Sequence, residues 1–225
     1  AMNSGALIGQ ALEQYGPDFL GVTVEVDAVD LSLSDGTGEI RGLTLGNPPG
    51  FEGPHSFYID RAALALDVES IGSDVIVVKS IVLDGAQPAV VVKGLKDTNF
   101  EAILDHLESN VGTSSGAGDT ASAGDEVKLI VDEFSFTNAV ASVDSDVLGD
   151  ASLEIPDIVL NDIGRKENGV LAAEAVKQMF KPISRAVTEG VVAQHSGLDK
   201  IKAGLEDKLE EAKKNPLKLL DKLSK

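Results

Sequence analysis

The sequence predicts an α+β protein in which a curved antiparallel β-sheet is accompanied by a short helix and by amphipathic C-terminal helices. Apolar and polar residues alternate through most of residues 22–163, which is the period of strands with one buried face. Near both ends of the chain the apolar period changes to that of a helix. Hydrophobic residues make up 43% of the 225 residues, enough to form a core. The alternating runs predict about eight to ten strands.

Three regions follow from this change of period. Residues 1–16 are expected to be an N-terminal helix that follows a removed anchor, and Gly16-Pro17 is expected to end it. Residues 17–165 are the β-rich body, in which the Gly- and Ser-rich segment 112–124 is predicted to be a flexible loop. Residues 166–225 are predicted to be helical.

The β-rich body contains a loosely repeated strand pattern. Each copy has apolar residues at fixed spacing and then a Gly or Asn, residue types that accept the positive φ of a turn or bulge. The second copy follows the first at an offset of 38, and the third follows the second at an offset of 53. The three copies are Ile40, Leu43, Leu45 and Asn47; Val78, Ile81, Leu83 and Gly85; and Val131, Phe134, Phe136 and Asn138.

Proline and asparagine positions predict where other elements begin or break. Pro88 indicates an edge strand or a bulge, because proline cannot donate to a ladder. Asn99 is the expected N-cap of a short helix over residues 99–108, with Phe100, Ile103, Leu104 and Leu107 on its apolar side. Pro182 is expected to kink or divide the helix that begins near Val170.

The C-terminal tail differs from the rest of the chain in charge. The whole chain has 37 acidic and 19 basic residues and a net charge of −18, which excludes a nucleic acid partner. Residues 199–225 hold eight Lys and six acidic residues. A last helix is expected from Leu198, with a break at Asn215-Pro216. Its apolar side is a candidate for docking to a membrane or a protein partner and comprises Leu198, Ile201, Leu205, Leu209, Leu217 and Leu220.

The chemistry-bearing residues form no catalytic or metal-binding pattern. Cysteine is absent, which excludes thiolate ligands and nucleophiles. His55, His106 and His195 are far apart, and Asp144, Asp146 and Asp150 lack the Gly and Glu of a calcium loop. We therefore expect no enzyme activity, no cofactor and no metal.

The apolar side of the predicted sheet is the remaining candidate site. It either packs under the helices as a closed core or stays partly open as a groove for acyl chains, and the sequence does not decide between them. The candidate lipid-binding residues are Val22, Val24, Val26, Leu43, Leu45, Leu64, Leu66, Ile81, Leu83, Phe134 and Phe136.

Four segments resemble the N-terminal region of AsmA-like cell-envelope proteins. In chain order they are residues 40–51 (IRGLTLGNPPGF), 77–86 (VVKSIVLDGA), 98–104 (TNFEAIL) and 153–164 (LEIPDIVLNDIG), and the likeness covers about residues 20–190. The resemblance implies an N-terminal transmembrane anchor in the inner membrane, absent from this sequence, and a β-rich body in the periplasm. Larger members of that family are implicated in phospholipid transport through an apolar β-groove, and the family supplies no catalytic residues.

Two hypotheses about function follow. The first is a non-enzymatic, membrane-anchored periplasmic protein that binds lipid, or helps to transport it, in an apolar groove of its sheet. The second is a structural or adaptor protein of the envelope that binds a protein partner through its C-terminal helices.

Overall fold

The computed structural model describes residues 4–94, 97–110, 128–147 and 149–214. The predicted flexible loop 112–124 lies outside these residues. Within the N-terminal helix and the C-terminal helix, some residues are described by their backbone alone, among them Leu198, Ile201, Leu205 and Leu209. Leu217 and Leu220 also lie outside the described residues.

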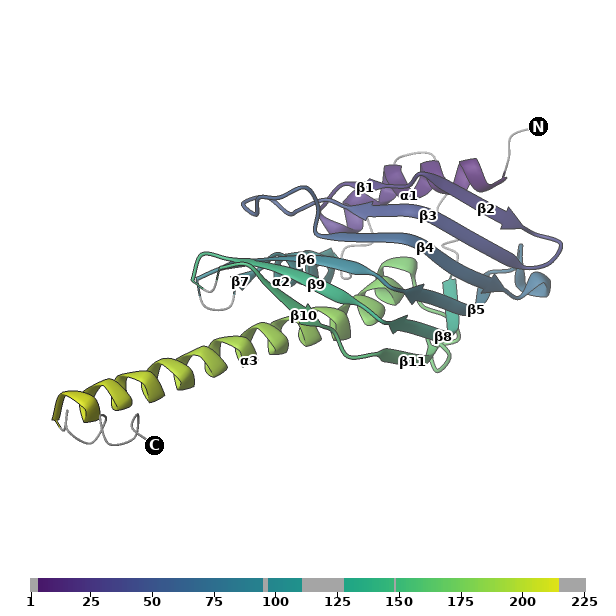
Figure 1. Ribbon diagram of the computed structural model, residues 1–225. Coiled ribbons are helices and arrows are strands. Elements are labelled where there is room, and N and C mark those ends of the chain that lie inside the picture. Colours follow the sequence, from purple (N-terminus) through teal and green to yellow (C-terminus); the bar gives the residue numbers. More distant parts are fainter. Residues whose placement is uncertain (1–3, 95–96, 111–127, 148, 215–225) are drawn as a thin grey trace.

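Three α-helices and eleven strands make up the described chain, which confirms the α+β class and the curved sheet. The sheet is curled into a half-barrel, and the helices line one of its faces (Figure 1). The helices are α1 (Ser4–Leu20), α2 (Asn99–Asn110) and α3 (Ala172–Lys214), with a 3₁₀ turn η1 (Val68–Ser70). The strands are β1 (Val24–Glu25), β2 (Ala28–Ser32), β3 (Thr37–Leu45), β4 (Phe57–Leu66), β5 (Val75–Asp84), β6 (Gln87–Lys93), β7 (Asp97–Thr98), β8 (Lys128–Thr137), β9 (Val140–Ser145), β10 (Ala151–Glu154) and β11 (Ile158–Ile163).

The sheet is mixed rather than wholly antiparallel. Its main path is β10-β9-β6-β4-β5-β8-β11, and β3 pairs with the other side of β4 and carries β1 and β2 at its far edge. All pairs are antiparallel except β5–β8 and β6–β9. The parallel pairs arise because the connection from β6 to β8 contains α2 and is long enough to return the chain to the same end of the sheet.

A line of positive-φ residues bends the sheet across several strands. Gly42, Gly85 and Asn138 have φ angles of 60°, 70° and 52°. The residue two positions before each of them belongs to one row of paired residues across the sheet. In this row, Ile40 pairs with Ala62, Ala62 with Leu83, and Leu83 with Phe136. Left-handed backbone at these points turns the chain, so apolar residues three apart face the same side. Phe136 and Ala139 illustrate this, since both are buried.

This row tests the repeat found in the sequence. The offset of 53 is confirmed, because Ile81 pairs with Phe134 and Leu83 with Phe136 in adjacent parallel strands. The offset of 38 in the sequence does not correspond to a cross-strand alignment in the sheet. Leu83 and Ile40 both pair with Ala62, from its two sides, and Ile40 lies 43 residues before Leu83. Gly42, rather than Asn47, is therefore the counterpart of Gly85.

Two predicted helix boundaries are wrong. α1 continues through Gly16 and Pro17 and ends at Leu20. Gly21, which follows it, has a φ of 70°, and its N–H donates to Pro17 O at 2.9 Å. Gly16 instead lets α1 pack closely on Val24, because Val24 Cγ2 lies 2.7 Å from where a Cβ of residue 16 would be. α3 is one helix through Pro182, with no separate helix at Leu198. Burial of Ile183 beside the proline helps to offset the roughly 3 kcal/mol that an interior proline costs.

Two further expectations concern the segment around α2. β6 lies between β4 and β9, so Pro88 does not mark an edge strand. The β6–β9 ladder begins at Ala89, which places the missing N–H of Pro88 just before it. The N-cap of α2 is Thr98 rather than Asn99, because Thr98 Oγ1 accepts the Glu101 N–H at 3.1 Å.

Candidate functional site

The helix-covered side of the sheet, here called the inner face, carries two complete apolar rows. The register joins residues of six strands in each row, and every member except Gly38 has an apolar side chain. The first row is Val29, Ile40, Ala62, Leu83, Phe136 and Ile158. The second row, two residues further along each strand, is Leu31, Gly38, Leu64, Ile81, Phe134 and Leu160.

The three helices cover this face unevenly. α1 packs on the β1–β2 edge, where Gly16 faces Val24 and Gly9 faces Val29. α3 packs on the same face over β8, β11 and β10, where Gly190 faces Leu153 of β10. α2 lies between them and is held to α3 by a stacked pair of rings, Phe100 on Phe180, with centroids 5.6 Å apart. The half of the sheet nearest α2 is therefore a closed core.

The other half of the inner face is only partly covered. Val29, Ala62, Phe134 and Phe136 are buried, whereas the other apolar members of the two rows retain intermediate exposure. We call these half-buried residues the inner strip: Leu31, Ile40, Leu64, Ile81, Leu83, Ile158 and Leu160. Five of them, Ile40, Ile81, Leu83, Ile158 and Leu160, pack against the buried core.

The structure sorts the predicted lipid-binding residues into two groups. Val22, Val24, Leu45, Phe134 and Phe136 are buried in the core, so they line no open groove. The others are half-buried: Val26, Leu43, Leu64, Leu66, Ile81 and Leu83. Sequence reasoning missed Leu31, Ile40, Ile158 and Leu160, although their alternation with polar residues was a usable signal.

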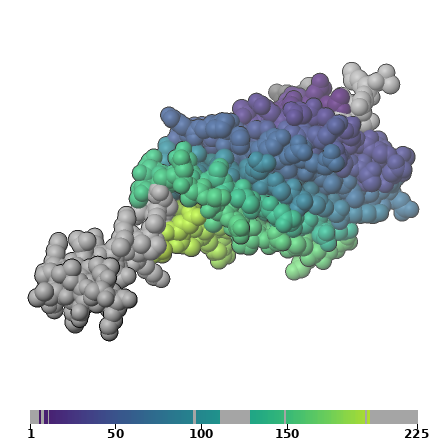
Figure 2. Space-filling view, viewed as in Figure 1, coloured from purple at the N-terminus to yellow at the C-terminus, as the bar shows by residue number. Residues whose placement is uncertain are grey.

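The outer face of the sheet, away from the helices, carries polar side chains beside apolar ones, and Figure 2 draws the molecule space-filling in the same view as Figure 1. On it, Asp84 Oδ1 accepts hydrogen bonds from Asn138 Nδ2 at 2.7 Å and from Thr137 Oγ1 at 2.8 Å. These bonds hold the pKa of the Asp84 carboxyl below its ordinary value. The Asn138 N–H donates to Asp157 Oδ1 at 3.1 Å. This network ties three neighbouring strands together at the bend.

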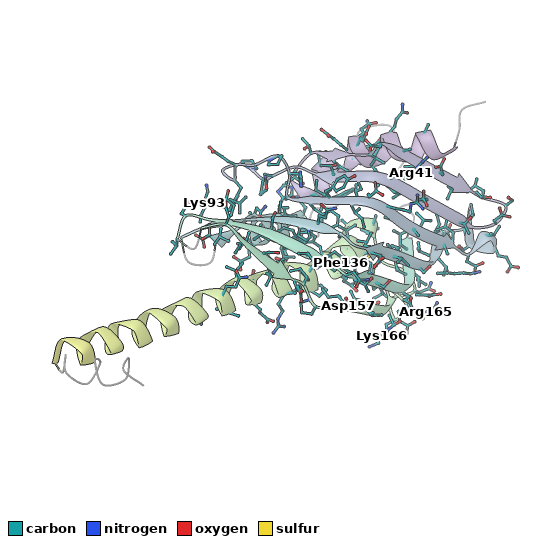
Figure 3. All side chains as sticks on the ribbon, viewed as in Figure 1. Arg41, Lys93, Phe136, Asp157, Arg165 and Lys166 are labelled. Carbon is teal, nitrogen blue, oxygen red and sulfur yellow. The ribbon has the colours of Figure 1, made fainter. Side chains whose placement is uncertain are left out.

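Several charged side chains elsewhere on the sheet form ion pairs or contacts with rings. Arg41 pairs with Asp30 at 2.5 Å, and both Arg41 and Arg61 contact Glu39. Figure 3 shows Lys93 and Arg165 at opposite ends of the sheet, with Phe136 between them. Lys93 lies over the Phe51 ring, 4.9 Å from its centroid, and Arg165 pairs with Asp132. The Lys93 and Arg165 contacts hold loops against strands.

Two further findings concern metals and membranes. Within residues 4–94, 97–110, 128–147 and 149–214, no three His, Asp or Glu side chains are grouped closely enough to hold a metal ion. Over the same ranges, no helix is both long and apolar enough to cross a bilayer.

No protein-family model, curated protein or solved structure matched the chain in comparisons with known proteins.

Proposed function

We propose that the protein is a non-enzymatic module of the cell envelope that binds an acyl chain along the inner strip. The single observation that supports this is the set of half-buried apolar side chains, interspersed with buried ones, on the helix-lined face of a curled sheet. An acyl chain laid on the strip removes apolar surface from water, and each buried methylene contributes about 0.8 kcal/mol. The proposal is consistent with the resemblance of residues 20–190 to AsmA-like proteins.

Neighbouring residues of β4 provide the test. Leu64 lies on the inner strip, and Ala63 lies on the outer face and is exposed. We expect the Leu64→Glu protein to lose bound lipid, because a carboxylate on the strip would lose its hydration against an acyl chain. The Ala63→Glu protein should keep its lipid. Native mass spectrometry of fresh preparations, with solvent extraction, measures the lipid. Far-ultraviolet circular dichroism must show both variants folded. Equal lipid content in the two folded variants contradicts the proposal.

A second candidate function rests on the length of α3. The helix runs to Lys214 and extends well past the sheet (Figure 1), which suits an adaptor that docks a protein partner. A protein that ends at Gly197 separates the two candidates. We expect it to retain the lipid content of the whole chain, because the inner strip lies outside the removed segment. Loss of lipid in the shortened protein would show that the tail, not the strip, holds it.

A further inference from the structure

The last part of α3 projects away from the sheet. Gln194 Nε2 donates to a backbone carbonyl of β10 at 3.0 Å. Residues 195–214, here called the projecting helix, continue α3 past the sheet (Figure 1) and are about 30 Å long at 1.5 Å per residue. A lone helix of this length is only marginally stable in water. Gly197 and Gly204 weaken it further, so a second element packed along it would stabilise it.

The projecting helix has an apolar stripe that is symmetric about Leu205. Ile201 and Leu209 lie four positions to either side of Leu205, and Leu198 and Ala212 lie seven positions to either side. Residues at these spacings share one face of a helix. When a second copy of the helix runs antiparallel, Leu205 faces Leu205, Ile201 faces Leu209, and Leu198 faces Ala212. The stripe is therefore complementary to itself under a two-fold axis.

The charged residues beside the stripe also suit an antiparallel second copy. In that arrangement, Lys202 lies near Glu206 of the second copy, and Asp199 lies near its Lys213, so opposite charges meet along one flank. The projecting helix contains five Lys and five acidic residues, so it carries no net charge. Two copies can therefore approach along this helix without net repulsion.

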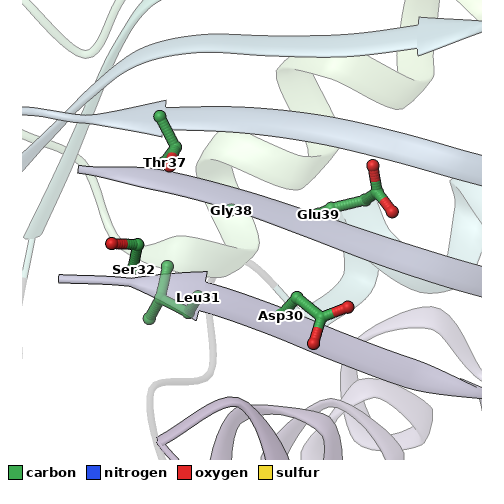
Figure 4. Close-up of a pocket in the computed structure, with 6 residues that line it drawn as sticks. All are labelled: Asp30, Leu31, Ser32, Thr37, Gly38 and Glu39. Atoms are coloured by element: carbon green, nitrogen blue, oxygen red, sulfur yellow. The ribbon is translucent and has the colours of Figure 1, made fainter. Parts of the chain in front are cut away.

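The rest of the chain is strongly acidic, and this favours the antiparallel orientation over the parallel one. Residues 1–194 contain 31 acidic and 11 basic residues. Asp30 and Glu39 line a hollow on β2 and β3 (Figure 4), and Asp144 and Glu154 are exposed on β9 and β10. A parallel pair would bring two such acidic surfaces together. An antiparallel pair holds them at opposite ends of helices about 30 Å long, beyond the roughly 8 Å screening length of physiological salt.

We propose that the protein forms a two-fold symmetric dimer in which the projecting helices of two copies pair antiparallel along the apolar stripe. The two sheets then lie at opposite ends of the paired helices. This dimer does not depend on acyl binding, because every residue of the inner strip precedes the projecting helix in the chain and lies on the sheet.

Sedimentation velocity of the whole chain tests the interface, at concentrations up to about 100 μM to cover the affinities of short helix pairs. We expect Leu205→Glu to raise the dissociation constant of the dimer at least about a hundredfold. Each dimer would lose two leucines at its centre and gain two facing carboxylates. The matched control is Ala203→Glu, which places the same charge on the other side of the helix and should change the constant by less than about threefold. Far-ultraviolet circular dichroism must show both variants folded.

Cysteine cross-linking tests the orientation. The natural sequence contains no cysteine, so Ile201→Cys and Leu209→Cys can each be introduced as a single thiol. The two proteins are oxidised separately and as a mixture, and one of them carries an affinity tag that changes its mass. Antiparallel pairing predicts that disulfides form mainly between the two different variants in the mixture.

Three results would overturn the inference. A monomer at every concentration overturns the dimer, and the stripe then belongs to another protein or to residues 215–225 of the same chain. A dimer that Leu205→Glu leaves intact overturns the stripe as the interface. Disulfides that form mainly within each single variant overturn the antiparallel arrangement. Each of these results leaves the acyl-binding proposal standing, since the lipid measurements on Leu64→Glu test that separately.

Discussion

Phe100→Ala is expected to lower the free energy of unfolding by about 3–5 kcal/mol, the range for truncating a fully buried phenylalanine. The Phe100 side chain is completely buried and stacks on Phe180 with an interplanar angle of 5°. Alanine would leave a cavity between α2 and α3 and remove the ring contact that joins them. Phe180 is itself largely buried in α3 and would lose its partner.

Urea unfolding followed by circular dichroism measures this effect. The matched control is Phe19→Ala in α1, where the ring is 37% exposed, and its effect should stay below about 1 kcal/mol. Similar losses in the two variants would contradict the interpretation of the α2–α3 contact as the centre of the closed core.

Local patterns in the sequence predicted elements that depend on near neighbours. Alternation placed the strands, and helical spacing placed Phe100, Ile103 and Leu107 on one side of α2, where all three are buried. The offset of 53 located two strands that pair in register. In each case, the polarity of a residue determines whether its side chain faces the core or the solvent.

Features that depend on distant contacts were not predictable in this way. Pro17 and Pro182 remain inside helices, because packing against the sheet and α2 outweighs the local preference of proline. The parallel pairs depend on the path of the chain through α2, which no short sequence window contains.

The candidate site shows the same difference between what local patterns predict and what distant contacts decide. The sequence identified the apolar face but could not show which of its residues the helices cover. Val24 and Phe136 are as strongly apolar as Ile81 and Leu83, yet the first two are sealed and the last two are half-buried. The difference comes from where α1, α2 and α3 lie on the sheet, and this depends on contacts such as Gly16 with Val24.

Asn99 connects three segments through a fully buried amide. Its Oδ1 accepts the Val91 N–H at 3.0 Å, and its Nδ2 donates to Ala89 O and to Asn47 Oδ1, each at 2.8 Å. It therefore fixes the start of α2 to β6 and to the loop after β3. These bonds explain why an asparagine is needed here even though Thr98 supplies the helix cap.

Asn99→Leu is expected to destabilise the protein by about 3 kcal/mol or more, because leucine has nearly the same volume but leaves those three groups without this partner. Thr98→Ala is the matched control, since it removes only the cap bond and should cost about 1 kcal/mol. Amide hydrogen exchange at Val91 should also accelerate in Asn99→Leu and stay slow in Thr98→Ala. If the two variants lose equal stability and Val91 remains protected in both, the Asn99 network does not hold α2 against β6.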